Sequence, residues 1–126
     1  MAKAWSVEPS TFVGLVEEEV GKRLRIISMA LLAEIVQRSP VDTGRFRANN
    51  QVSLGGPDYS QLATTDKSGA STIQQGNAVI AQGKPYSVIY IQNNLAYAES
   101  LENGHSQQAP AGIYATSFHG VSQAYK

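Results

Sequence analysis

The chain has 126 residues, of which 42% are hydrophobic and only 16% are charged, and its ten basic residues balance its ten acidic residues. This length fits a single domain spanning residues 1–126, and zero net charge excludes a general electrostatic attraction to nucleic acid or to anionic membranes. The lack of cysteine excludes disulfides, thiolate metal sites and a cysteine nucleophile.

The sequence also bears on location and association. Residues 1–5 lack the apolar run of a signal peptide, and the most apolar stretch, residues 26–36, is too short to span a bilayer. We therefore expect a protein that is made and kept in a cytoplasm and has no membrane partner. A surface poor in charge and rich in amide and hydroxyl side chains favours self-association.

A long amphipathic helix is predicted from Ser10 or Thr11, either of which can cap its first turn, to about Arg38. Its apolar residues recur at steps of three and four: Phe12, Val16, Val20, Leu24, Ile27, Leu31 and Ile35. A second apolar strip in the carboxy-terminal half predicts that residues 25–36 are the more buried part. Pro40 ends the helix, because proline disfavours helical backbone in the residue before it.

The segment after this helix changes character. Residues 41–44, Val-Asp-Thr-Gly, predict a turn in which Asp42 can cap and Gly44 can adopt a positive φ. Residues 45–54 alternate in polarity and predict a strand. Residues 58–76 are polar with few large aliphatic side chains and predict a long loop. We hypothesise that this loop is mobile in a free subunit and becomes ordered against a neighbour.

The remaining elements are short. Strands are predicted over residues 77–81 and 87–92, a helix over 95–101 ended by Asn103 and Gly104, and a final helix over 112–124. The fold class is therefore predicted as α+β. A long N-terminal helix packs on a small, mainly antiparallel sheet of about four strands, with two short C-terminal helices.

Candidate catalytic or metal-binding residues are few. Glu99 and Glu102 share a face of a short helix and precede His105, so together they could hold a cation. A solvated helix face followed by a loop histidine explains the same residues without chemistry, and we predict no catalytic residue, no metal and no cofactor. Arg38, Arg45 and Arg47 form the one basic cluster, which suits DNA phosphates, an acidic neighbour or plain solvent.

Three segments together resemble one protein family. They are Ser39-Pro40-Val41-Asp42-Thr43-Gly44-Arg45-Phe46-Arg47 after a long helix, Asn94-Leu95-Ala96-Tyr97-Ala98-Glu99-Ser100-Leu101-Glu102-Asn103-Gly104, and Ser106-Gln107-Gln108-Ala109-Pro110-Ala111-Gly112 before a last helix. This ordered set is similar to the small tailed-phage proteins known as head–tail joining, tail-completion or neck proteins, related in role to tail terminators. The resemblance extends from about Phe12 to Tyr125, and residues 58–76 match no family pattern.

The resemblance implies a structural virion protein and not an enzyme. It implies a ring of identical copies, a hexamer, between the tail tube protein and a neck or connector protein, with genomic DNA passing through the lumen without sequence recognition. The location implied is the tail or neck of a virion that is assembled in the cytoplasm of a host bacterium. Candidate interface residues are Arg38, Asp42, Arg45, Arg47, Tyr97 and Glu102.

Three alternatives come from other functional classes. A nucleic-acid-binding module would use the arginine cluster, although zero net charge argues against it. A small hydrolase or metal enzyme would use Glu99, Glu102 and His105. A tail-assembly chaperone would act during assembly and be absent from the finished particle.

Overall fold

Helix α1 (Pro9–Arg38) is the longest element of the computed structural model, which describes residues 9–103, 108 and 112–125. The predicted end at Arg38 is confirmed. The helix begins at Pro9, a residue suited to the first helical position because its missing N–H needs no partner there. Ser10 and Thr11 therefore lie inside the helix, and their predicted role as caps was wrong.

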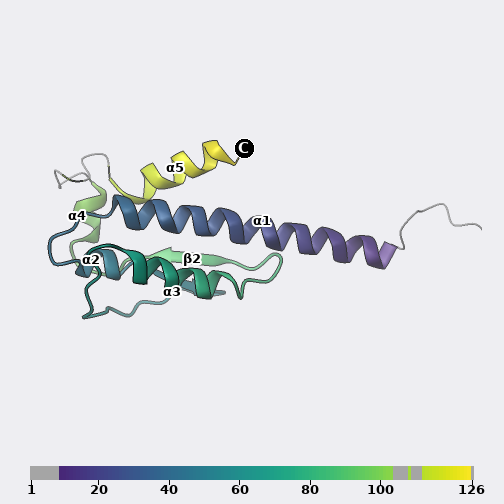
Figure 1. Cartoon of the computed structure of the whole chain (residues 1–126), viewed down its shortest axis with the longest axis horizontal. Helices are drawn as coiled ribbons and strands as arrows, with labels where there is room; N and C mark the ends of the chain where they lie inside the picture. The colour runs from purple at the N-terminus through teal and green to yellow at the C-terminus, as the bar shows by residue number, and fades with distance from the viewer. Residues whose placement is uncertain (1–8, 104–107, 109–111, 126) are drawn as a thin grey trace, which may run out of the picture.

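The carboxy-terminal half of α1 forms the centre of the fold. Leu32, Ile35 and Val36 are almost fully buried, whereas Glu17 and Glu18 are exposed, as the predicted burial of residues 25–36 requires. Figure 1 shows α5 along one side of α1, and α3 with the sheet along the other side. Two apolar clusters result, one around Ile35 and the other around Leu32 and Val36.

The sheet has two strands among the described residues, not the predicted four. Strand β1 (Gln51–Leu54) pairs antiparallel with β2 (Ile89–Gln92), with Val52 opposite Ile91 and Leu54 opposite Ile89. The strand predicted over residues 87–92 is confirmed in its main part, and the predicted α+β class with an antiparallel sheet is confirmed as well.

The predicted strand over residues 45–54 was wrong in its first half. Helix α2 (Arg45–Ala48) is a single helical turn that follows Gly44. Its Phe46 and Ala48 are buried while Arg45 and Arg47 are partly exposed, so one short turn gives the same alternation of burial as a strand. The pattern therefore could not distinguish the two structures.

Helix α3 (Ala70–Ile80) replaces both the second half of the predicted loop and the strand predicted over residues 77–81. Its buried residues Thr72, Gly76 and Ile80 follow each other at four-residue steps, which is the helical period. Gly76 lies against Leu32, where a Cβ atom would overlap the leucine side chain. Small side chains let α3 approach α1 closely, and they gave no apolar pattern to recognise.

The C-terminal helices agree with expectation. Helix α4 (Ala98–Glu102) and helix α5 (Tyr114–Ala124) occupy the regions predicted for the two short helices. Gly104, which was predicted to end α4, lies outside the described residues. No helix in the described part of the chain is both long and apolar enough for a transmembrane segment.

Candidate functional site

The predicted turn after α1 is present and is held by Thr43 and Gly44. Gly44 has a φ of 90°, a conformation that favours glycine. The Thr43 Oγ1 atom accepts the Arg45 N–H at 3.2 Å, and Gly44 is the N-cap residue of α2, so the predicted capping role of Asp42 was wrong. The Gly44 carbonyl accepts the Asp66 N–H at 2.9 Å, and Asp42 is exposed. The turn therefore anchors the loop that precedes α3.

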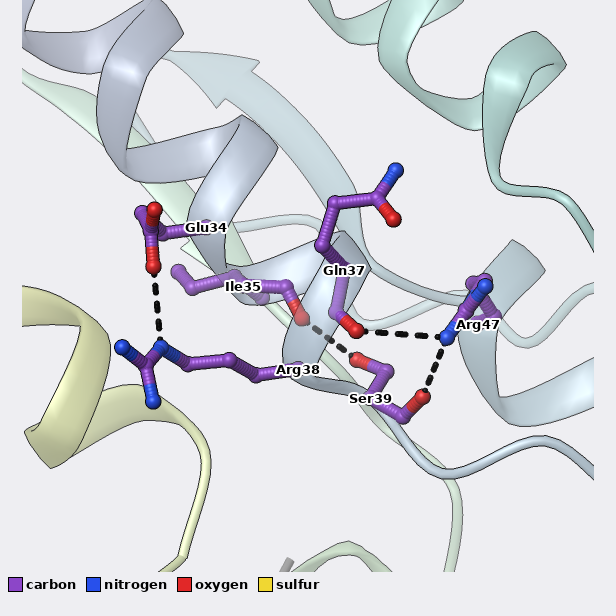
Figure 2. Close-up of polar contacts among 6 residues, drawn as sticks. All are labelled: Glu34, Ile35, Gln37, Arg38, Ser39 and Arg47. Atoms are coloured by element: carbon purple, nitrogen blue, oxygen red, sulfur yellow. Dashed lines mark hydrogen bonds and ion pairs between the residues drawn. The ribbon is translucent and has the colours of Figure 1, made fainter. Parts of the chain in front are cut away.

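Arg47 joins three segments at the end of α1, and Figure 2 shows its bonds to Gln37 and Ser39. Its Nη2 atom donates to the carbonyls of Ser39 at 2.8 Å and Gln37 at 3.3 Å, and its Nη1 atom donates to the carbonyl of Lys67 at 2.8 Å. The last carbonyls of a helix lack partners within the helix, and a cation there also suits the helix dipole. Arg47 thus closes α1 and ties the loop to it.

The other two arginines of the basic cluster have different partners. Arg45 donates from Nε to the Leu62 carbonyl at 3.1 Å, which fastens the loop from the other side. Arg38 pairs with Glu34 at 2.9 Å on the surface of α1, also drawn in Figure 2. The structure does not bring the three guanidinium groups to one open phosphate-sized site. Arg45 and Arg47 are hydrogen-bonded to carbonyls of their own chain.

A buried amide network, which the sequence did not predict, lies behind this turn. The Asn50 Nδ2 atom donates to Ser39 Oγ at 2.8 Å, and Ser39 Oγ donates to the Ile35 carbonyl at 2.7 Å. The Asn50 Oδ1 atom accepts the Tyr114 hydroxyl at 2.8 Å. Burial and the nearby Glu102 carboxylate raise the pKa of Tyr114, so this hydroxyl stays a donor. The network connects α1, the residue just before β1, and α5.

Glu102, a residue of the second motif, accepts hydrogen bonds from the first backbone N–H groups of helix α5. Its carboxylate accepts the N–H groups of Ile113 at 3.0 Å, Tyr114 at 2.7 Å and Ala115 at 2.9 Å. Partial burial alone would raise the pKa of Glu102, but these three donors hold that pKa below its ordinary value. Glu102 is therefore used for folding and is not free to serve as a metal ligand.

Described residues from all three motifs line one groove, although the motifs are far apart in the sequence. This groove, which we call the motif groove, has a volume of about 530 Å³ and is lined by Pro40, Val41, Asp42, Thr43, Gly44, Arg45, Phe46, Tyr97, Leu101 and Gln108. The rings of Phe46 and Tyr97 lie with their centroids 5.7 Å apart. Gln108 exchanges two hydrogen bonds with the backbone of Val41, at 2.8 and 3.1 Å.

The predicted interface residues differ in their exposure. Arg38, Asp42 and Tyr97 present side chains to solvent, and Tyr97 is 43% exposed at the rim of the motif groove. Arg45, Arg47 and Glu102 make the intramolecular hydrogen bonds described above. Their part in an interface remains a prediction.

The candidate cation site of Glu99, Glu102 and His105 is only partly visible. His105 lies outside the described residues, and Glu102 is occupied by α5. Among the side chains that the structure describes, no three of His, Asp or Glu lie close enough together to hold a metal ion. The described contacts of these residues hold the fold together. No protein-family model, curated protein sequence or solved structure matches the chain.

Proposed function

We propose that this chain is a structural virion protein of a tailed phage that forms a ring at the head-proximal end of the tail. The observation that carries the proposal is the convergence of the three motifs on the motif groove. Of the motif residues, Gly44 turns the chain, Arg47 closes the end of α1, and Glu102 binds the first N–H groups of α5. Residues that resemble a family of ring-forming proteins thus have architectural roles.

The proposed mechanism is geometric. Identical copies contact each other through unlike surfaces, and rotation closes the contacts into a ring of six copies. The ring ends growth of the tail tube on one side and offers a docking surface to a neck or connector protein on the other. We propose that exposed side chains near the motif groove, among them Asp42 and Tyr97, contribute to these contacts.

Contact with the genomic DNA is proposed to be weak and independent of sequence. Arg45 and Arg47 donate to backbone carbonyls, and Arg38 is paired with Glu34. A chain with zero net charge and its arginines engaged in this way releases few counterions on binding DNA. Steep salt dependence of duplex DNA binding would instead favour a nucleic-acid-binding module.

The test is the mass of the purified protein by light scattering, measured alone and after mixing with tail tubes, with electron microscopy of the same samples. A closed ring in solution, or a monomer that becomes a ring on the end of a tube, is the expected result. A monomer that binds neither tubes nor heads would overturn the proposal. Association with growing tails followed by absence from finished particles would identify an assembly chaperone instead.

A further inference from the structure

A second, apolar groove shares no lining residue with the motif groove. It has a volume of about 480 Å³, and we call it the edge groove; its lining residues are Ser28, Leu31, Ile35, Ile89, Tyr90, Ile91, Tyr114, Ala115 and Phe118. Helix α1 contributes the floor, while β2 and α5 contribute the two walls. Ile35 is almost fully buried, whereas Phe118 on the α5 wall is 64% exposed. Together with the apolar lining of the groove, the exposed Phe118 ring makes this surface a candidate contact site.

The β2 wall is an open strand edge. The Gly55 N–H donates to the Val88 carbonyl at 2.9 Å, and the register continues as Leu54 opposite Ile89. Because hydrogen-bonded and non-bonded pairs alternate in an antiparallel ladder, the backbone groups of Ile89 and Ile91 point away from β1. No strand of the described residues lies beyond β2. The edge groove therefore offers backbone donors and acceptors as well as apolar side chains.

These two properties together fit an extended segment better than a helix. A helix has its own backbone groups paired internally, so it would cover the edge of β2 without satisfying it. An extended segment adds a strand, satisfies the edge and places alternate side chains in the groove. A two-stranded sheet is also the one that gains most from a third strand.

The sequence before α1 has the alternation that an added strand requires. Trp5 and Val7 alternate with Ala4, Ser6 and Glu8, so an extended backbone would turn the two large apolar side chains to one face. Trp5 is the single tryptophan of the chain. A large aromatic ring on one partner and an apolar groove on the other are the usual components of an interface hot spot.

This segment cannot fill the edge groove of its own copy. Helix α1 projects with its N-terminal end beyond the sheet and α5 (Figure 1). Pro9 is about 28 Å along the helix axis from Ser28, the nearest α1 residue of the groove, at 1.5 Å per residue. Trp5 lies at most about 14 Å of extended chain from Pro9. If this segment occupies an edge groove, the groove therefore belongs to another copy.

We propose that the segment around Trp5 of one copy adds as a strand to the β2 edge of a second copy, with Trp5 beside Phe118. Each copy then gives one segment and receives another through unlike surfaces, which is the arrangement that closes a ring. Only the closing of these contacts into a ring rests on the proposed function; the contact between two copies does not. Zero net charge leaves no overall repulsion between the copies.

A binding experiment tests this contact without requiring a ring. The full chain with Trp5→Ala contains no tryptophan, so a synthetic peptide of residues 1–8 supplies the whole tryptophan fluorescence. We expect saturable binding with a blue shift of the emission and reduced quenching by acrylamide, because the indole enters the edge groove. Phe118→Asp in the same chain should weaken binding at least about tenfold.

The matched control is Tyr59→Asp, because Tyr59 is 77% exposed and does not line the edge groove. This variant should bind the peptide like the Trp5→Ala chain alone, and circular dichroism should show that all variants fold. No spectral change with excess chain, or equal binding by the Phe118→Asp variant, would overturn the inference.

Light scattering on mixed variants separates the inference from the proposed function. A Trp5→Ala chain and a Phe118→Asp chain each lack one half of the contact, so their mixture should stop at a dimer. Rings formed by the Trp5→Ala chain would sink the inference and leave the proposed function standing. If the chain binds the peptide and forms rings that do not bind tubes or heads, the inference stands and the proposed function fails.

Discussion

The carboxylate of Glu102 accepts the backbone N–H of Tyr114 at 2.7 Å, so that the last residue of α4 fixes the first residue of α5. Two further N–H groups, those of Ile113 and Ala115, complete the arrangement. The first N–H groups of a helix have no partners within it, and a carboxylate supplies both acceptors and a favourable charge. Since α5 packs along α1, the contact between Glu102 and α5 helps to hold α5 against the central helix.

Replacing Glu102 with alanine should lower the free energy of unfolding by about 1–2 kcal/mol, since a capping group is lost. Glu102→Gln keeps one acceptor oxygen but loses the charge, so we expect about half of that effect. Urea denaturation followed by circular dichroism measures both. Glu34→Ala is the control, because its surface pair with Arg38 is worth about 0.5 kcal/mol or less. Equal effects of Glu102→Ala and Glu34→Ala would contradict this role.

Stability should decrease in acid because of Glu102 and Asp66. Burial alone would raise the pKa of Asp66, but donors from Thr72, Gly69 and Ser68 lower it, as the N–H groups of α5 lower that of Glu102. A carboxyl group with a lowered folded pKa binds protons more readily in the unfolded chain. Its contribution is therefore complete above the ordinary values of 4.5 for Glu102 and 3.8 for Asp66. It is lost as the pH falls through the folded values.

Thermal unfolding between pH 7 and pH 3 measures this dependence. The melting temperature should be nearly constant at neutral pH and drop below about pH 4.5. The Glu102→Gln variant should start lower and show a shallower drop, because it has lost one of the carboxyl groups whose pKa is lowered by folding. An acid dependence as steep as that of the parent chain would show that Glu102 does not contribute.

Arg47 should be far more important for stability than Arg38, although the two are similar in sequence context. Arg47→Met removes the donors to the carbonyls of Gln37, Ser39 and Lys67, and should cost about 2 kcal/mol. Arg38→Met removes an exposed ion pair with Glu34 and should cost about 0.5 kcal/mol or less. Chemical denaturation of the two variants side by side gives the comparison, and similar losses would refute the assignment.

Gly44→Ala should destabilise the turn by about 2 kcal/mol or more, because an alanine with positive φ is strained. The added Cβ would also lie 2.7 Å from the Lys67 nitrogen, which is backbone and cannot move aside easily. Gly56→Ala is the matched control, since nothing lies within 4 Å of its Cβ position. Differential scanning calorimetry measures both variants. A Gly44→Ala chain as stable as the Gly56→Ala chain would argue against the anchoring role of the turn.

The sequence by itself determined the elements whose signals are local. The end of α1 was predictable because Pro40 acts on its immediate neighbours, and the buried half of α1 because an apolar helix face repeats over many residues. Strand β2 and the two C-terminal helices were predictable from composition and from Asn and Gly at their boundaries. The Val41–Gly44 turn was predictable because only glycine adopts its backbone conformation readily.

Only the tertiary structure decided the elements whose partners are distant. Helix α3 depends on Asp66, which accepts the Thr72 N–H at 2.7 Å, and on Gly76 packing against Leu32. Loops separate Arg47 and Glu102 from their hydrogen-bond partners along the chain. A polarity pattern indicates which residues are buried, but it does not indicate which atoms form hydrogen bonds. Hydrogen bonds and close packing depend on positions in space that the whole fold sets. For the same reason, the sequence could not predict that β2 is an edge strand. A strand is an edge strand when no further strand pairs with it, and this depends on the whole fold.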